Sequence, residues 1–403
     1  MIFRQRWHTP TMVVGAGCLI SLIGFGARSS FGLFLEPMTV AHAWPRETFA
    51  LAMAFQNLLW GLGLPIAGAI ADRRGAVGVI AAGTMLYAGG TLAMASAESG
   101  TALLIAGGVV VGLGMAFSSF SLALAAMARV VGPERRSFAL GVGTAAGSLG
   151  QVVFSPVVQG FIVNYGWSLA LTLLAAMIMA MLPLAFVLPG NPTADRNDGD
   201  DFGLTAALTE ALNHRGYLLL TSGFFVCGFH VAFVVVHFPA YVRDLGFDAA
   251  VGAYAIAILG LFNILGAFLS GVAGQRYSKR LSLCWIYAGR ALVITWFLTA
   301  PMSASTVYLF SAAMGVLWLS TVPLTTGIVA QVFGPRYMAT LFGVVFLGHQ
   351  LGSFTGVWLG GRIHDFTGSY ELMWQLAVAL SVFATLIHWP IDEKPLVRRS
   401  QTV

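Results

Sequence analysis

Two arginines stand inside long apolar runs of the sequence, where a permanent charge is costly. Arg28 lies in the second half of the run 11–37, and Arg290 lies near the middle of the run 281–300. A charge at the centre of a bilayer costs about 2.5–3.5 kcal/mol on insertion scales, so each arginine needs a compensating role. We expect Arg28 to attract a small anion, because a fixed cation in a low-dielectric region offsets part of the anion's desolvation. The alternative is that Arg28 extends toward the headgroups or pairs with Glu36.

Arg290 has two interpretations that the sequence leaves open. In the first, it braces neighbouring helices by donating to backbone carbonyls or by contacting Tyr287. In the second, it reaches the central cavity and assists Arg28 in binding an anion. Arg290 is kept as a candidate binding residue on the second interpretation.

His230 and His237 lie on one face of the apolar run 215–241. Seven residues advance a helix by about 10.5 Å but leave the second side chain rotated by only about 20° from the first. Because histidine titrates near neutral pH, either side chain is a candidate for carrying a coupled proton. The alternative is that each one hydrogen-bonds a neighbouring helix.

The apolar run 337–363 carries His349 beside Gln350. Adjacent helical residues point about 100° apart, so at most one of the two faces a central cavity squarely, and we expect it to be His349. Asn263 and Ser118 are further candidate binding residues, although amides and hydroxyls also join helices to one another. Weaker candidates of the same kind are Gln56, Asn57, Ser119 and Gln151.

The 16 acidic residues all fall in loops, in the polar middle segment or at helix ends. A buried carboxylate is therefore not expected as a proton carrier, and coupling to protons would use histidine or the ligand itself. The three cysteines, Cys18, Cys227 and Cys284, stand alone without CxxC spacing. We expect packing residues here, not a disulfide framework or a zinc site, and we predict no metal, no cofactor and no catalytic residue.

The composition indicates a protein that lies in a membrane. Of the 403 residues, 58% are hydrophobic and 9% charged, and the mean hydropathy is +0.82. Soluble proteins carry about a quarter charged residues, so no large soluble domain is expected. The net charge of +5 comes from basic residues in short connections, which fits membrane topology better than nucleic-acid binding.

Twelve apolar segments alternate with short polar connections, in two groups of six. We predict a first bundle within residues 1–188, a polar linker at 189–214 and a second bundle within 215–403. Basic residues concentrate in the connections on one side, which predicts cytoplasmic termini and insertion in the plasma (inner) membrane. The segments are 11–37, 47–71, 76–96, 102–128, 137–163, 167–188, 215–241, 249–273, 281–300, 306–332, 337–363 and 371–390.

The two groups repeat each other in sequence. The stretch 68–73 recurs 203 residues later at 271–276. A duplicated six-helix unit is a recurrent design of membrane transporters, with the ligand site near mid-membrane between the two halves. Four glycine pairs lie 202 residues apart: Gly132 and Gly334, Gly141 and Gly343, Gly150 and Gly352, and Gly166 and Gly368.

The loop Gly68-x-x-x-Asp72-Arg73-Arg74-Gly75 resembles the signature between helices two and three of the major facilitator superfamily, and the resemblance covers nearly the whole chain. It implies an all-α integral membrane fold of twelve helices, in two six-helix bundles related by a pseudo-twofold axis. It also implies alternating access, with Asp72 and Arg73 acting in a gate. The alternative is a solvated loop charge.

More narrowly, the chain resembles the bacterial monocarboxylate porter and oxalate:formate antiporter group. Porters of this group carry a cavity-facing basic residue at the position of Arg28. They commonly carry an arginine for the substrate carboxylate where this chain has Ala267. The stretches that carry the resemblance are 26–32, 135–141, 260–266 and 365–370.

We therefore expect a secondary transporter, a monomer in the lipid bilayer, that moves a small organic solute, best a monocarboxylate-like anion. Proton symport is a hypothesis that rests on His230 and His237. A rival interpretation is export of a larger amphiphile, which Ala267 favours together with the aromatic residues Phe229, Phe233 and Trp318. A membrane enzyme or receptor is disfavoured because the sequence has no HExxH motif and no convincing carboxylate pair.

Overall fold

The computed structural model describes residues 9–131, 133–188, 204–334 and 338–396. Within these ranges the regular structure is helical. There, 11 helices are long and apolar enough to cross a membrane. One of them, Gly141–Ala185, has 45 residues and is interrupted at Gly166, so it supplies two crossings. The described residues thus hold twelve apolar crossing segments, which confirms the predicted fold class.

The first half of the chain begins with a crossing made of three successive pieces. They are α1 (Pro10–Ser30), the 3-10 turn η2 (Phe31–Phe34) and α2 (Leu35–His42). The other pieces of this half are α3 (Arg46–Arg74), α4 (Ala76–Met94), α5 (Gly100–Leu103), the π-helical turn η3 (Leu104–Val110), α6 (Val111–Phe117), α7 (Phe120–Val130), α8 (Pro133–Met179) and α9 (Met181–Ala185).

The second half begins with a short helix, α10 (Leu204–Asn213), before its first crossing. The crossings are α11 (Arg215–Asp244), α12 (Ala249–Arg276), α13 (Lys279–Thr299), the pair α14 (Ala304–Leu317) and α15 (Thr321–Phe333), α16 (Met338–Thr367) and α17 (Glu371–His388).

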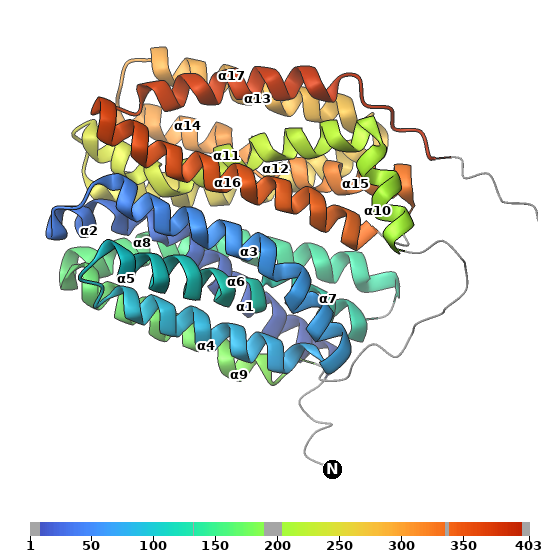
Figure 1. Ribbon diagram of the computed structural model, residues 1–403, viewed down its shortest axis with the longest axis horizontal. Helices are drawn as coiled ribbons and strands as arrows, with labels where there is room; N and C mark the ends of the chain where they lie inside the picture. Colours follow the sequence, from blue (N-terminus) through green and yellow to red (C-terminus); the bar gives the residue numbers. More distant parts are fainter. Residues whose placement is uncertain (1–8, 132, 189–203, 335–337, 397–403) are drawn as a thin grey trace, which may run out of the picture.

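The two halves lie side by side, with the blue-to-green helices below the yellow-to-red helices in Figure 1. Along the boundary α3 packs against α16, and α8 packs against α12. The buried apolar residues form two clusters, one centred in each half. We call the end of the molecule at which α2 ends and α3 begins the distal end, and the opposite end the proximal end.

The sequence repeat corresponds to a structural repeat. Gly166 and Gly368, 202 residues apart, have φ angles of +78° and +73°, which side chains other than glycine rarely adopt. Gly150 lies so close to α1 that a Cβ there would be 1.9 Å from the carbonyl oxygen of Leu22. Gly352 makes the same approach, also 1.9 Å, to the carbonyl oxygen of Phe225 on α11. The same close helix contact is thus built once in each half.

Both halves also contain a broken helix at the same place in the repeat. The first break lies at Ser118 and Ser119, between α6 and α7. The second lies at residues 318–320, between α14 and α15. A break within a membrane exposes backbone N–H and C=O groups that need partners from neighbouring helices or from a cavity. Arg28 lies beside the first break, and Arg290 and Asn263 lie beside the second.

Candidate functional site

Arg28 lies deep in the first half, and its surroundings contain an acceptor and aromatic faces. Its side chain is 7% exposed, and Nη2 donates to Oδ1 of Asn57 on α3 at 3.0 Å. The guanidinium carbon lies 4.9 Å from the ring centroid of Trp60 and 5.7 Å from that of Phe25. Among the described residues no carboxylate pairs with Arg28, since Glu36 accepts from Arg243 at 3.1 Å instead. Its charge is therefore only partly compensated.

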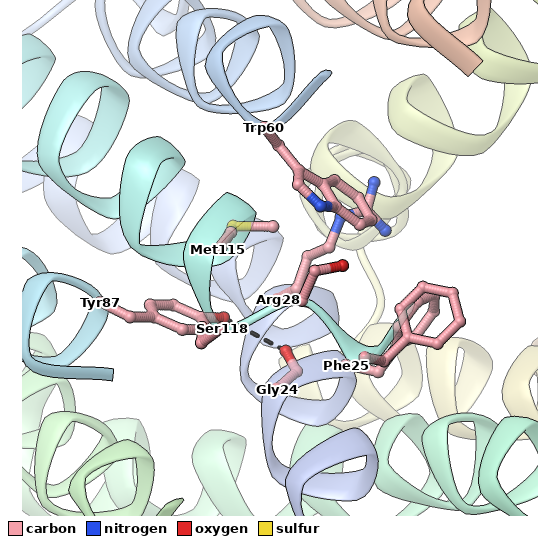
Figure 2. A pocket seen from close by; sticks show the side chains of 9 residues that line it. Gly24, Phe25, Arg28, Trp60, Tyr87, Met115 and Ser118 are labelled. Carbon is pink, nitrogen blue, oxygen red and sulfur yellow. Dashed lines mark hydrogen bonds between the residues drawn. The ribbon is translucent and has the colours of Figure 1, made fainter. Parts of the chain in front are cut away.

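A small cavity adjoins Arg28 within the first half (Figure 2). Its volume is about 20 Å³, which is roughly the space that one water molecule needs. The Arg28 Nε atom is buried and has no hydrogen-bond partner. An unpartnered buried donor beside a cavity is the arrangement that a polar ligand or a water would complete. The lining residues are Gly24, Phe25, Arg28, Trp60, Tyr87, Met115, Ser118, Ser119 and Phe120.

The helix break between α6 and α7 contributes to the same cavity. Ser118 and Ser119 line it, and α7 begins at the next residue, Phe120. Helix N-termini present free N–H groups and the positive end of the helix dipole, both of which favour an anion. Arg28 and the start of α7 therefore make one site of positive potential. Ser118 is the predicted binding residue that the structure brings together with Arg28.

Trp60 separates this cavity from the second half of the molecule. Its ring packs edge-on against Phe346 of α16 with a centroid distance of 5.5 Å. Next to it, Gly61 lies against Gln350, whose side-chain nitrogen and oxygen are both buried without a partner. Trp60 Nε1 is likewise buried and unpartnered. Unsatisfied polar atoms thus gather on both sides of this boundary.

His349 lies against α11 and Phe346, although it adjoins Gln350 in sequence. Its ring lies 4.8 Å from the ring of Phe224 on α11 and 5.7 Å from the ring of Phe346. Of the adjacent pair, Gln350 is therefore the residue that faces the first half. The sequence gives the angle between two neighbours on a helix but not the rotation of the helix itself. A direct role of His349 in binding stays a prediction.

Arg290 braces the helix break of the second half. It is fully buried, and its Nε and Nη2 donate to the carbonyl oxygen of Leu317 at 3.1 and 2.8 Å. Nη2 also donates to the carbonyl oxygen of Trp318, and the guanidinium lies 5.1 Å from the Tyr287 ring centroid. These carbonyls end α14, so the cation satisfies the negative end of that helix. The contacts match the bracing interpretation, and Arg290 does not line the Arg28 cavity.

His230 and His237 are buried in the second half, on the side of α11 that faces α16 and α17. His230 Nε2 lies 2.9 Å from the carbonyl oxygen of Ala377, while its Nδ1 is buried without a partner. His237 Nε2 lies 2.8 Å from the carbonyl oxygen of Val357, and its Nδ1 lies 3.0 Å from the Tyr370 hydroxyl. A carbonyl only accepts, so Nε2 of each ring carries a proton. The structure does not bring either histidine to the Arg28 cavity, and their role in coupling stays a prediction.

Asn263 joins the two halves in the middle of the molecule. Its Nδ2 donates to Ser148 Oγ on α8 at 3.0 Å, and its Oδ1 accepts from the N–H of Leu319 at 3.0 Å. It therefore connects the first half to the α14–α15 break. Its role as a binding residue also stays a prediction.

The distal end carries ion pairs between the halves that sequence reasoning missed. Arg46 at the start of α3 pairs with Asp244 at the end of α11. Asp365 of α16 accepts from the backbone N–H groups of Arg46 and Glu47, at 3.0 and 2.6 Å. Among the described residues, every ion pair between the halves lies at this end. The pairs are Arg46–Asp244, Arg243–Glu36 and Arg362–Glu47, and we call this set the distal ion pairs.

Tyr370 extends this network toward the histidines. Burial raises the pKa of the Tyr370 hydroxyl, so this group stays protonated. It accepts from Arg46 Nη1 at 3.1 Å, which leaves its own proton for Nδ1 of His237. His237 is thereby linked to the distal ion pairs by one hydroxyl group.

The predicted gate residues lie at the proximal end of α3. Arg73 is exposed there, one residue before the helix ends. The side chain of Asp72 lies outside the described residues. Their role in a gate therefore stays a prediction.

Comparisons with known proteins agree with this architecture. Residues 17–357 match the family model described as Major Facilitator Superfamily. The chain is 26% identical over 395 residues to monocarboxylate transporter 13 of Rattus norvegicus, covering 94% of this chain and 89% of that protein. It is 22% identical over 364 residues to the uncharacterized MFS-type transporter YcxA of Bacillus subtilis (strain 168), covering 86% of each.

Solved structures share the fold at low sequence identity. A bacterial homolog of the human lysosomal transporter Spinster, inward-facing and occupied, has a TM-score of 0.75 at 16% identity, covering 94% of this chain and 96% of its own. The inward open xylose transporter XylE from E. coli has a TM-score of 0.73 at 12% identity, covering 95% and 96%. Both likenesses concern the fold alone.

Proposed function

The chain belongs to the major facilitator superfamily, and from this premise we propose that it moves a small organic anion of the monocarboxylate class across the membrane by alternating access. It is an integral membrane transporter and not an enzyme. The single observation that carries the anion assignment is Arg28, a buried cation beside a cavity with no carboxylate partner among the described residues. A carboxylate ligand would supply the missing counter-charge.

The shape of the Arg28 site supports a small ligand with an apolar body. The guanidinium and the start of α7 suit one carboxylate group, while the rings of Phe25, Trp60 and Phe120 suit a short carbon chain. The cavity volume of about 20 Å³ is too small for even a short carboxylic acid. In this conformation the site is therefore closed, and binding requires the halves to separate.

Alternating access in this protein would use the distal ion pairs as one of its two gates. They join the distal ends of the two halves, so this gate is engaged in the conformation described here. The two solved relatives named above are described as inward-facing and inward open. With cytoplasmic termini, as the basic residues predict, the distal gate faces outward and the proximal end faces the cytoplasm.

Uptake into proteoliposomes tests the anion assignment. A panel of labelled monocarboxylates, each paired with its neutral amide, would be measured for the parent, Arg28→Gln and Arg28→Lys. Arg28→Gln should raise the apparent KM for the acids at least about tenfold, the effect of losing one charge-assisted hydrogen bond of about 1.5–3 kcal/mol. Arg276→Gln, an exposed arginine at the end of α12, is the matched control and should leave KM unchanged. Equal transport of acids and amides by the parent would reject the proposal.

Export of a larger amphiphile is a second candidate, because the molecule has a larger cleft elsewhere. This cleft has a volume of about 460 Å³ and lies near the distal end between α2, α8, α11 and α12. Its walls are mostly apolar, with Glu36, Gln159, Arg243 and Asp248 as polar groups. The same proteoliposomes distinguish the candidates. Transport of amphiphiles that is insensitive to Arg28→Gln, without transport of short acids, would favour this second function.

A further inference from the structure

Cys227 and Arg290 stand together at the α14–α15 break, away from the Arg28 site. Cys227 Sγ lies 3.6 Å from Arg290 Nη2 and 3.2 Å from Thr321 Oγ1. All three side chains are fully buried. The sequence alone suggests a packing cysteine. The structure places its sulfur against a guanidinium and a hydroxyl instead.

The positive charge of Arg290 needs a counter-charge, and no carboxylate among the described residues supplies it. Arginine remains protonated in proteins, and a buried charge is stable only when it is paired. Within the described ranges Arg290 forms no ion pair with Asp or Glu. Its partners are carbonyl oxygens and the Cys227 sulfur, and its Nη1 is buried without a partner. Among the described residues, Cys227 is thus its one ionisable hydrogen-bond partner.

The break between α14 and α15 favours a positive charge beside the end of α14 and a negative charge beside the start of α15. Arg290 donates to the carbonyls that end α14, where the helix dipole is negative. Cys227 lies against Thr321, the first residue of α15, where the dipole is positive. A thiolate is favoured beside a helix N-terminus and beside an arginine, and Cys227 has both neighbours. If the sulfur is ionised, the Thr321 hydroxyl donates to it.

We propose that Cys227 and Arg290 form a buried thiolate–guanidinium ion pair, which is a protonation site in the second half. Taking up one proton converts the thiolate to a thiol and leaves Arg290 with carbonyl partners only. Releasing it returns the proton to solvent and restores the pair. The groups that face the pair are Tyr287 of α13, His349 of α16, Thr321 of α15 and His230 of α11 itself.

This site would couple protonation to the conformation of the α14–α15 break. With the thiolate formed, Arg290 is held between the end of α14 and the sulfur, so the two pieces of the broken helix are fixed to α11. With the thiol formed, one of these attachments weakens. Asn263, which binds Leu319 within the same break, carries the effect to α8 of the first half. Only this last step rests on the proposed transport function.

The three cysteines of the chain allow the thiolate to be observed directly. In a Cys18→Ser and Cys284→Ser background, Cys227 is the single thiol. The purified full-length transporter in detergent should then show the ultraviolet absorbance of one thiolate at neutral pH. Adding Cys227→Ser should abolish this absorbance, and acidification of the background protein should abolish it reversibly. No difference between the two proteins at neutral pH would overturn the proposal.

Two further variants distinguish the ion pair from a thiolate held by other means. Arg290→Gln removes the cation, and should remove the absorbance at neutral pH. Because it also removes the brace on α14 and can prevent folding, Thr321→Val serves as a milder test, since it removes only the hydroxyl. It should reduce the thiolate fraction at neutral pH, whereas unchanged absorbance in both folded variants would overturn the pairing.

Transport measurements then separate this inference from the proposed function. In the single-thiol background, the pH dependence of monocarboxylate uptake should flatten when Cys227→Ser is added, while counterflow exchange at fixed pH persists. A thiolate signal without any monocarboxylate transport would reject the proposed function and leave the ion pair intact. Uptake with an unchanged pH profile in the Cys227→Ser protein would reject the coupling step.

Discussion

Arg46 and Asp244 join the two halves of the transporter through two parallel contacts at the distal end. Nη1 lies 2.6 Å from Oδ2, and Nη2 lies 2.6 Å from Oδ1. Such a two-pronged geometry is the strongest form of an arginine–carboxylate pair. The Asp244 side chain is 36% exposed, so the pair remains in contact with water and is worth little alone. A gate built from several weak ion pairs can hold the two halves together and still open.

Removing this pair should shift the protein toward a distal-open state. In Asp244→Asn the loss of about 1 kcal/mol would change the ratio of closed to open molecules by about fivefold. Spin labels at the exposed positions Val40→Cys and Ser369→Cys, one in each half, would report the distance across the gate. Asp392→Asn, an exposed acid at the proximal end, is the matched control. An unchanged distance distribution in Asp244→Asn would show that the pair does not hold the gate.

Asn57 should act on substrate binding through Arg28. Its Oδ1 accepts from Arg28 Nη2, and its own Nδ2 donates to the carbonyl oxygen of Met53 at 2.8 Å, which fixes the amide. Asn57→Ala leaves the guanidinium free to rotate, so the apparent KM for a monocarboxylate should rise about tenfold. Asn164→Ala, which changes an exposed asparagine on α8, should leave KM unchanged. A normal KM in Asn57→Ala would mean that Arg28 needs no positioning partner.

Gly150 should be essential for the packing of α8 on α1. An added Cβ would lie 1.9 Å from the carbonyl oxygen of Leu22, so Gly150→Ala must push two backbones apart. We expect a loss of about 1–3 kcal/mol, seen as a lower Tm of the purified protein. Gly141→Ala in the same helix has open space around it and should leave Tm unchanged or raise it. Equal Tm values for the two variants would contradict the close contact.

His230 and His237 remain the predicted proton carriers on α11. Replacing both by glutamine should abolish uptake driven by an inward acid gradient while preserving counterflow exchange. His230 has a free Nδ1 in this structure, whereas both nitrogens of His237 are engaged, so His230→Gln alone should have the larger effect. Gradient-driven uptake that survives the double replacement would assign coupling to another group, and Cys227 is the first candidate.

The sequence predicts the crossings well because each depends on local chemistry. Hydropathy locates the spans, and it separates 137–163 from 167–188, between which the structure has Gly166 at a positive φ. Arg28 could be found in the same way, since a cation in an apolar run is visible without any knowledge of its neighbours. The repeat of Gly150 and Gly352 also follows from spacing alone.

The partners of these residues could not be predicted, because they depend on how the helices dock. Asn57 lies 29 residues from Arg28, and Asp244 lies 198 residues from Arg46. No local pattern states which acid at one helix end meets which base at another. The same limit applies to Cys227, which looks like a packing residue until Arg290 and Thr321 are placed beside it.

The first turn of α3 depends on Asp365, a residue of the other half, for its N-terminal cap. The amides of Arg46 and Glu47 are capped by a carboxylate from α16, not by a residue of their own segment. Whenever the bundles part at this end, those two amides lose their acceptor and turn to water. Deuterium uptake at the amides of Arg46 and Glu47 would therefore measure how often the distal end opens in a protein without spin labels or substitutions.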